Sequence, residues 1–403
     1  MKVRIDKNTL GTNEHLVVDS GSEYYWHDED CDVHAGSQDR RAVQIEDLAK
    51  MLDFPVECLD ISDSAHLRSF EALGLQGLNI PWSMVLGRRK FTARLKQVIK
   101  AIQEVTRDPE ITRYVETYRR GNEFLKTLQR PRIDVDRMRQ HRAELSGGVA
   151  PISALASFLP DDTGLAPEIE YDRVSTVTGR LKVARGPAVL TLQKECRDII
   201  TSRVGGSVWE VDFVSLEPRV ALNIMGAQPP RDIYEGVRDR LNMSGVTRSA
   251  IKQAVISALY GSSSSALAEA LGGRREAQGL IREVKEYFKV SDLVARLRSE
   301  MDRFDGRLHN YYGRPLIDAK GDDQDPKLIS HYLQSSAVDV ALLGFKDLSS
   351  RLSASGVQPI YVIHDAVLFD VPAGREAQLQ EECTAGVDLE MGHFELGLKR
   401  VSQ

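Results

Sequence analysis

Two aspartates stand where apolar segments end, and both could bind metal ions. Asp212 lies near the end of the run Val208–Phe213, and Asp365 lies at the polar tip of a predicted hairpin over Pro359–Pro372. Strand-end carboxylates can hold two divalent cations roughly 3.5 to 4 Å apart, the arrangement that phosphoryl transfer uses. Magnesium needs only one or two protein carboxylates, because it retains water and binds substrate phosphates. An aspartate at a turn is also an ordinary structural feature, so either residue alone is weak support.

The segment Thr247–Gly261 predicts a helix suited to a nucleoside triphosphate. Thr247 is a favourable N-cap and Gly261 a favourable C-terminal stop. One stripe of this helix, about 18 Å long at the usual rise per residue, carries Arg248, Lys252, Ile256 and Tyr260. Cations at the positive helix N-terminus favour an anionic triphosphate there, and a tyrosine ring can stack against a base. The alternative is an ordinary surface helix, which the terminal Tyr-Gly makes less favoured.

Composition indicates a globular, cytoplasmic protein. A chain of 403 residues can form two or three domains with a sizeable core. It has no apolar run near the roughly 18 to 20 residues that span a bilayer and no N-terminal signal pattern, so we expect no membrane association. The cysteines are widely spaced, which argues against a disulfide framework and a zinc site. They are Cys31, Cys58, Cys196 and Cys383.

Charge is segregated along the chain. Residues 1–80 contain sixteen Asp or Glu and seven Lys or Arg, whereas residues 81–145 contain sixteen Lys or Arg and eight Asp or Glu. This shift predicts a domain boundary near Pro81. Helical periodicity from Arg88 onward predicts two or three amphipathic helices with basic faces, which include Arg89 and Lys90 and suit contact with a nucleic-acid backbone. A solvated helix face is the competing interpretation. After Gly147 and Gly148 the sequence predicts mainly β structure, and helices again after Asp232.

Five segments occur in the order found in family A DNA polymerases, the family typified by bacterial DNA polymerase I. Asp212–Arg219 resembles motif A, Arg248–Gly261 resembles motif B, and His364–Asp365 resembles motif C. Thr178–Leu181 is similar to the family's TGRL segment, and Gln334–Asp339 is similar to its Q-x-x-A-x-D helix. The resemblance spans roughly residues 88 to 390. Any one motif is weak, but five in order make a chance match improbable.

The resemblance implies a catalytic centre. Asp212 and Asp365 would bind two Mg²⁺ ions, for which Mn²⁺ can substitute. Arg248 and Lys252 would hold the triphosphate, and Ile256 would face the incoming sugar.

The resemblance also implies contacts to base, sugar and primer. Tyr260 would abut the nascent base pair, and Glu217 would exclude ribonucleotides. Arg180 and Gln334 would contact the minor-groove side of primer-template DNA. His364 would lie near the primer terminus, although a hydrogen-bonded turn histidine is an equal alternative.

The implied fold is α+β with a right-hand architecture: an antiparallel palm sheet, helical fingers and a helical thumb. The expected ranges are an acidic N-terminal domain at 1–80, a thumb at 81–150, palm at 151–227 and 319–403, and fingers at 228–318. The implied activity is template-directed addition of dNTPs to a primer 3′ hydroxyl in replication or repair.

Several positions depart from the family pattern. Ala366 stands where a glutamate is usual, Ile256 replaces an aromatic residue, Tyr234 replaces a phosphate-contacting histidine, and Ser330 replaces an asparagine. Fidelity and sugar selectivity are therefore not inherited directly from the resemblance.

The first 80 residues are too few for the family's exonuclease domain and contain no D-x-E on a predicted strand. We therefore expect no 3′–5′ proofreading. Their acidic character predicts a scaffold, a support for the thumb, or a docking surface for a replication or repair protein.

Two other functions fit part of the pattern. A single-subunit RNA polymerase shares the R-x3-K helix and the His-Asp turn, but Glu217 argues against it. A catalytically inactive nucleic-acid-binding protein would explain Ala366, but such a protein has no need of both Asp212 and Asp365.

Overall fold

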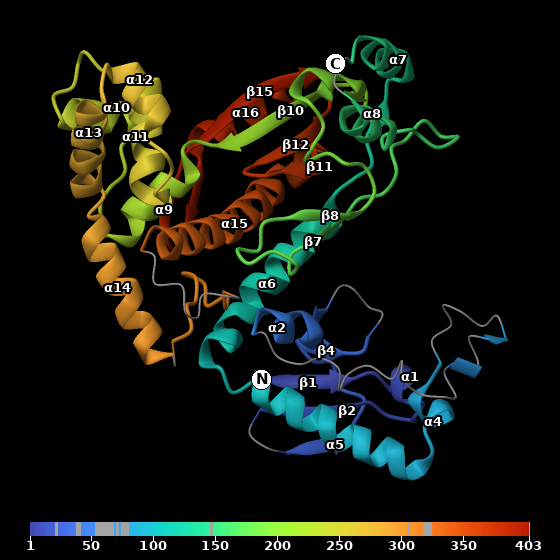
Figure 1. Ribbon diagram of the computed structural model, residues 1–403. Coiled ribbons are helices and arrows are strands. Elements are labelled where there is room, and N and C mark those ends of the chain that lie inside the picture. The colour runs from blue at the N-terminus through green and yellow to red at the C-terminus, as the bar shows by residue number, and fades with distance from the viewer. Residues whose placement is uncertain are drawn as a thin grey trace. The chain divides into compact units, whose positions relative to one another are not determined.

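The computed structural model describes residues 1–20, 23–37, 42–52, 68–69, 72–73, 80–145, 148–304, 306–316 and 325–402. The chain forms a mixed α+β fold of two compact units (Figure 1). Unit 1 comprises Met1–Glu123 with His309–Ile317, and unit 2 comprises Phe124–Leu308 with Asp318–Gln403. Within the described ranges, no helix has both the length and the apolar character needed to cross a membrane.

Unit 1 contains a mixed sheet in the order β3-β2-β1-β4-β5. Its strands are β1 (Lys2–Ile5), β2 (Leu16–Asp19), β3 (Tyr24–Trp26), β4 (Val33–Ala35) and β5 (Val43–Gln44). β1 is antiparallel to β2 and parallel to β4. Helix α2 (Ile45–Met51) directly follows β5.

The helices of the basic segment begin where periodicity predicted, but the first of them packs on the N-terminal sheet. These helices are α5 (Arg88–Val105) and α6 (Pro109–Thr127), and two short helices, α1 (Lys7–Leu10) and α4 (Trp82–Val85), precede them in the chain. α5 buries Val98, Ile102 and Val105 and packs against β2 and α2. The compact units therefore divide at Glu123 and Phe124 rather than near Pro81, because burial of an apolar stripe outweighs a change in surface charge.

This packing predicts that Ile102→Ala destabilises unit 1. Ile102 is completely buried, and truncation of such a side chain typically costs about 2 to 5 kcal/mol. Calorimetry should show a lower unfolding temperature for the variant. Lys96→Ala on the exposed side of the same helix is the control and should leave unfolding unchanged. An unaltered transition in Ile102→Ala would contradict the packing of α5.

Unit 2 is built on a four-stranded sheet in the order β11-β12-β10-β15. The strands are β10 (Ser207–Phe213), β11 (Gln358–Ile363), β12 (Ala366–Val371) and β15 (Leu396–Ser402). Every pair is antiparallel, as predicted. α15 (Asp325–Leu352) lies along one face of the sheet (Figure 1). The ring centroids of Phe213 and Phe345, a residue of this helix, lie 5.1 Å apart, and the two rings are tilted by 47°. A Cβ at Gly344 would lie 2.7 Å from the Phe213 ring. The glycine therefore permits close packing of α15 on β10.

The opposite face of the sheet, which carries Asp212, is only partly covered. A hydrophobic cluster that includes Phe158, Ile199, Val208 and Leu368 packs on it. Val208 lies at the start of β10 and Asp212 near its end, so the cluster covers the far end of the strand. The end that bears Asp212 is left free to form a site.

The remaining elements of unit 2 are mainly helical. They are α7 (Val135–Glu144), α8 (Val149–Ala156), α9 (Leu216–Ile224), α10 (Ile233–Arg240), α11 (Arg248–Tyr260), α12 (Ser265–Leu271), α13 (Arg274–Tyr287), α14 (Val290–Arg303), α16 (Glu376–Ala385), the 3₁₀ turns η2 (Lys194–Ile199) and η3 (Ser353–Ser355), and the short strands β6 (Arg132–Ile133), β7 (Glu170–Asp172), β8 (Lys182–Arg185), β9 (Ile200–Thr201), β13 (Val387–Leu389) and β14 (Gly392–Phe394). Helix α8 follows Gly148, where mainly β structure was expected, because Val149–Ala156 is rich in alanine and other apolar residues. α9 was not predicted as a separate helix.

Three of the four cysteines lie in the described part of the chain. Cys31, Cys196 and Cys383 are free thiols, and the last two are buried. Cys58 and Gly147 lie outside the described residues.

Candidate active site

The register of the sheet brings the two aspartates together. Asp212 on β10 pairs directly with Ala366, the first residue of β12. Asp365 precedes Ala366, and its carbonyl accepts a hydrogen bond of 3.2 Å from the Phe213 N–H. His364 takes a φ of 55°, which permits the two-residue turn that closes the hairpin. The end of β10 and the turn before β12 therefore place both carboxyl groups at the same end of two paired central strands.

Both carboxyl groups have raised pKa values. Desolvation, with a further contribution from Glu210, raises the pKa of Asp212 to about 6. Desolvation, Glu217 and then Asp212 raise the pKa of Asp365 to about 6, although Arg180 acts in the opposite direction. The effect of Asp212 on Asp365 requires that the two groups lie close enough to repel each other. A bound cation would relieve this repulsion.

The two carboxylates fit a magnesium ion that takes most of its ligands from water and substrate. Two carboxylates supply hard oxygen ligands, and the excess negative charge around them favours a divalent cation. In the described part of the chain, no group of three or more His, Cys, Asp or Glu side chains is arranged to hold a metal ion by itself. The remaining ligands would therefore come from water and phosphate oxygens, as is usual for magnesium.

Helix α11 begins and ends where the sequence predicted. The Thr247 hydroxyl accepts a hydrogen bond from the Ala250 N–H, and Gly261 ends the helix with a φ of 65°. Arg248 and Lys252 are both exposed to solvent. Lys252 lies near enough to Asp212 to counteract the rise of its pKa. The basic stripe of the helix therefore lies beside the strand that carries the first aspartate.

Glu217 links three of the sequence motifs. Its Oε1 accepts a hydrogen bond of 2.7 Å from Nη2 of Arg180, and its Oε2 accepts a hydrogen bond from the Tyr260 hydroxyl. Burial and the neighbouring Glu217 raise the pKa of Tyr260, so this tyrosine is a stable hydrogen-bond donor. The carboxylate of Glu217 is thus fixed between the TGRL turn and the end of α11.

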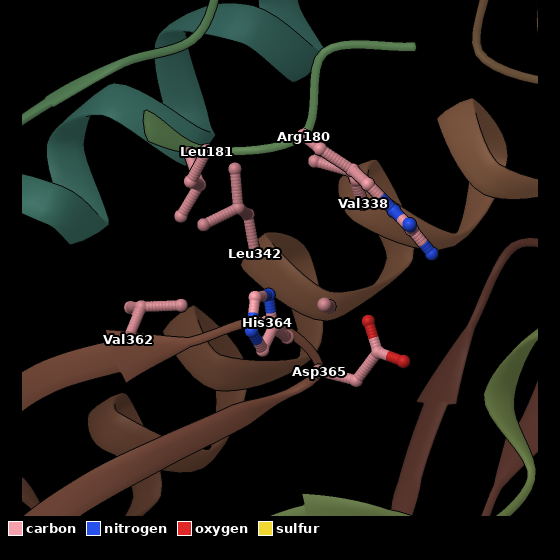
Figure 2. A pocket seen from close by; sticks show the side chains of 8 residues that line it. Arg180, Leu181, Val338, Leu342, Val362, His364 and Asp365 are labelled. Atoms are coloured by element: carbon pink, nitrogen blue, oxygen red, sulfur yellow. The ribbon is translucent and has the colours of Figure 1, made fainter. Parts of the chain in front are cut away.

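A pocket beside Asp365 has a mixed polar and apolar lining. It is lined by Arg180, His364 and Asp365 together with apolar side chains that include Leu181, Val338 and Leu342, and Figure 2 shows Val338 beside Arg180. Burial and the nearby arginines Arg180 and Arg197 lower the pKa of His364, which favours the neutral imidazole.

The other predicted site residues occupy separate positions. Gln334 lies on α15 and donates a hydrogen bond of 3.0 Å to Ser330. Ile256 is half-buried on α11. Arg89 and Lys90 are exposed on α5 in unit 1, whereas every other predicted site residue belongs to unit 2. The assignment of thumb, palm and fingers to particular ranges remains a prediction.

Sequence reasoning missed one charged pair beside the aspartates. Arg197 of η2 forms an ion pair with Glu210, which lies two residues before Asp212 on β10. Alternate residues of a strand share a face, so Glu210 and Asp212 point the same way. A charged residue inside the apolar run Val208–Phe213 was the available signal.

The fold is similar to that of a known polymerase domain. No protein-family model and no curated protein matches the chain. Among solved structures, the polymerase domain of Pol1 from M. smegmatis, in complex with DNA primer-template and dNTP, is similar with a TM-score of 0.61 at 14% identity. The similarity covers 96% of this chain and 92% of that chain. At this identity the comparison establishes a polymerase-domain fold.

Proposed function

We propose that this protein is a template-directed DNA polymerase of the family A type, which adds dNTPs to a primer 3′ hydroxyl. The observation that carries the proposal is the convergence of Asp212, Asp365 and Glu217 at one end of the central strands of the unit 2 sheet. The similarity to a polymerase domain solved with primer-template and dNTP supports it. The sheet would belong to the palm, residues 228–318 would form the fingers, and residues 81–150 the thumb.

Each residue of the site has a distinct role in this reaction. Asp212 and Asp365 would hold two Mg²⁺ ions, which when bound would activate the primer hydroxyl and stabilise the leaving pyrophosphate. Arg248 and Lys252 would bind the triphosphate and neutralise its charge. Tyr260 would support the base pair, and Glu217 would close the space beside the 2′ carbon of the sugar.

Primer extension tests the proposal directly. Purified protein, Mg²⁺ and a DNA primer-template should give extension with dNTPs and little with NTPs. Equal use of NTPs would favour the RNA polymerase alternative. Salt-sensitive DNA binding without extension in Mg²⁺ or Mn²⁺ would favour the inactive binding protein.

We also propose that the protein lacks 3′–5′ proofreading and that unit 1 is a scaffold or docking surface. β1 presents Lys2 and Arg4, which pair with Glu29 at 2.8 Å and Asp30 at 3.1 Å. Cations on this strand are unsuited to the carboxylate metal site of a nuclease. A 3′-mismatched primer should therefore remain undegraded without dNTPs.

Because these ion pairs neutralise part of the acidic charge, a replication or repair partner would meet a less acidic surface than the sequence predicted.

The double variant Arg89→Ala/Lys90→Ala should weaken duplex binding to a similar degree for all sequences. Both residues are exposed at the start of α5, where their charge adds to the positive end of the helix dipole. Loss of two phosphate contacts should reduce the slope of log Kd against log salt concentration by about 2. Fluorescence anisotropy at several salt concentrations measures this slope.

Lys100→Ala provides a matched control on the same helix, because Lys100 is paired with Glu104 at 3.6 Å. It should leave the slope unchanged. A double variant with the wild-type slope would place the DNA contacts elsewhere.

A further inference from the structure

Arg219 is a buried cation that the proposed reaction does not use. Its side chain is 2% exposed, and within the described residues no carboxylate lies at ion-pair distance from its guanidinium. Burying a charged group is costly unless it is well hydrogen-bonded. Arg219 lies on α9, two residues after Glu217, so it begins in the same segment as the proposed metal ligand Asp212.

The guanidinium of Arg219 holds the backbone that precedes α10. Its Nη2 donates to the carbonyl oxygens of Pro230 at 3.2 Å and Arg231 at 2.9 Å, and its Nε donates to the Val214 carbonyl at 3.5 Å. On the other side, a Cβ at Gly236 would lie 2.4 Å from Cγ of Pro230. The segment is therefore held between the buried arginine and the backbone of α10.

The next residue, Asp232, connects this segment to the triphosphate helix. Its Oδ1 accepts hydrogen bonds from the N–H groups of Tyr234 and Glu235 and so caps α10. Its Oδ2 accepts a hydrogen bond of 2.9 Å from Nε of Arg248. The Arg248 guanidinium also lies 5.0 Å from the centre of the Tyr234 ring. Because Nε is occupied, the two terminal nitrogens of Arg248 remain for a bidentate contact with phosphate.

We propose that Arg219 and Asp232 are positioning residues that set the orientation of Arg248 toward the triphosphate. The inference rests on the proposed function, because it assigns Arg248 a phosphate ligand. In this arrangement the strand that carries Asp212 and the helix that carries Arg248 are aligned through one buried guanidinium. Loss of either positioning residue weakens nucleotide binding without removing any group that touches the nucleotide.

Asp232→Asn separates the two roles of Asp232. Asparagine is as good an N-cap as aspartate, so the helix cap is retained, whereas its amide nitrogen cannot accept the hydrogen bond from Arg248. We expect the KM for dNTP to rise about tenfold while kcat falls less than about threefold and primer-template affinity is unchanged. Arg219→Lys should act in the same direction, because a lysine cannot reproduce the fixed fork of donors.

Two controls distinguish positioning from general destabilisation. In an Arg248→Ala background, Asp232→Asn should raise KM less than about twofold further. Arg351→Lys alters an arginine that pairs with Asp347 and donates to the Gly386 carbonyl, away from this chain of contacts. At a comparable loss of thermal stability it should leave KM unchanged.

Calorimetry with inorganic tripolyphosphate gives a readout that does not require extension. Its Kd should weaken about tenfold in Asp232→Asn and Arg219→Lys relative to wild type. Folded variants with wild-type KM and tripolyphosphate affinity would overturn the positioning role. A wild-type protein that binds tripolyphosphate as expected but extends no primer would instead overturn the proposed function.

Discussion

Asp212→Asn and Asp365→Asn are each expected to reduce primer extension by at least about a thousandfold. Either substitution removes one charged oxygen from the proposed metal site, in which Asp212 lies on β10 and Asp365 in the turn just before its partner strand β12, and no group of three or more potential ligands is arranged to replace it within the described chain. The measurement is single-turnover extension of a labelled primer at saturating dNTP and Mg²⁺. Extension at the wild-type rate in either variant would contradict the metal assignment.

The same variants should remain folded and should gain stability when metal is absent. Both aspartates have pKa values raised to about 6, well above the ordinary value of an aspartate. Such a group is easier to ionise in the unfolded chain, so it destabilises the fold above pH 6, and this cost disappears as the pH falls toward 4. Neutral asparagine removes the cost at pH 7.5.

Thermal unfolding at pH 7.5 in EDTA should therefore show a higher Tm for both variants, whereas added Mg²⁺ should raise the Tm of the wild type alone. Asp388→Asn on the exposed β13–β14 hairpin is a matched control for the loss of one charge. It should retain full extension. A lower Tm in Asp365→Asn would show that its carboxylate stabilises the fold.

Local signals were sufficient to predict the elements that carry the candidate site. The hairpin around Asp365 and the helix that begins at Thr247 and ends at Gly261 each depend on residues within one short segment. Turn residues, caps and apolar periodicity act over such distances. The meeting of Asp212 with Asp365 could be expected from the resemblance, but the register that pairs Asp212 with Ala366, the residue after Asp365, came only from the structure.

Contacts between distant segments could not be predicted in the same way. The packing of α5 on the first sheet depends on an apolar stripe that is visible in the sequence, but the stripe does not identify its partner. Arg219 has no pattern that marks it as buried, because its ligands are backbone carbonyls at Pro230 and Arg231. Charge segregation predicted a domain boundary that apolar packing overrides.

Two departures from the family pattern have structural counterparts. Ala366 is buried directly opposite Asp212, so a glutamate at this position would add a third carboxylate on the same face. Tyr234 lies beneath the Arg248 guanidinium, where its ring provides a surface for the cation. The first departure leaves the proposed metal site with one carboxylate fewer than the family pattern, and the second places an uncharged ring against the residue proposed to bind phosphate.

Glu217→Ala is expected to increase ribonucleotide incorporation relative to deoxynucleotide incorporation by about 10- to 200-fold, the range that shape exclusion in a pocket achieves. The carboxylate of Glu217 can exclude a 2′ hydroxyl only if it is held in place, and hydrogen bonds from Arg180 and Tyr260 hold it from two sides. Alanine removes both the bulk and these contacts. The ratio of kcat/KM for NTP and dNTP measures the effect.

Tyr260→Phe tests whether the position of Glu217 matters as well as its size. This variant keeps the ring and removes only the hydroxyl that donates to Oε2, while the ion pair with Arg180 at 2.7 Å remains. In Tyr260→Phe only Arg180 would hold the Glu217 carboxylate. This variant should therefore exclude ribonucleotides less well than the wild type does and better than Glu217→Ala does. Equal selectivity in all three proteins would show that Glu217 does not discriminate between sugars, and its hydrogen bonds would then serve only to join α11 and Arg180 to α9.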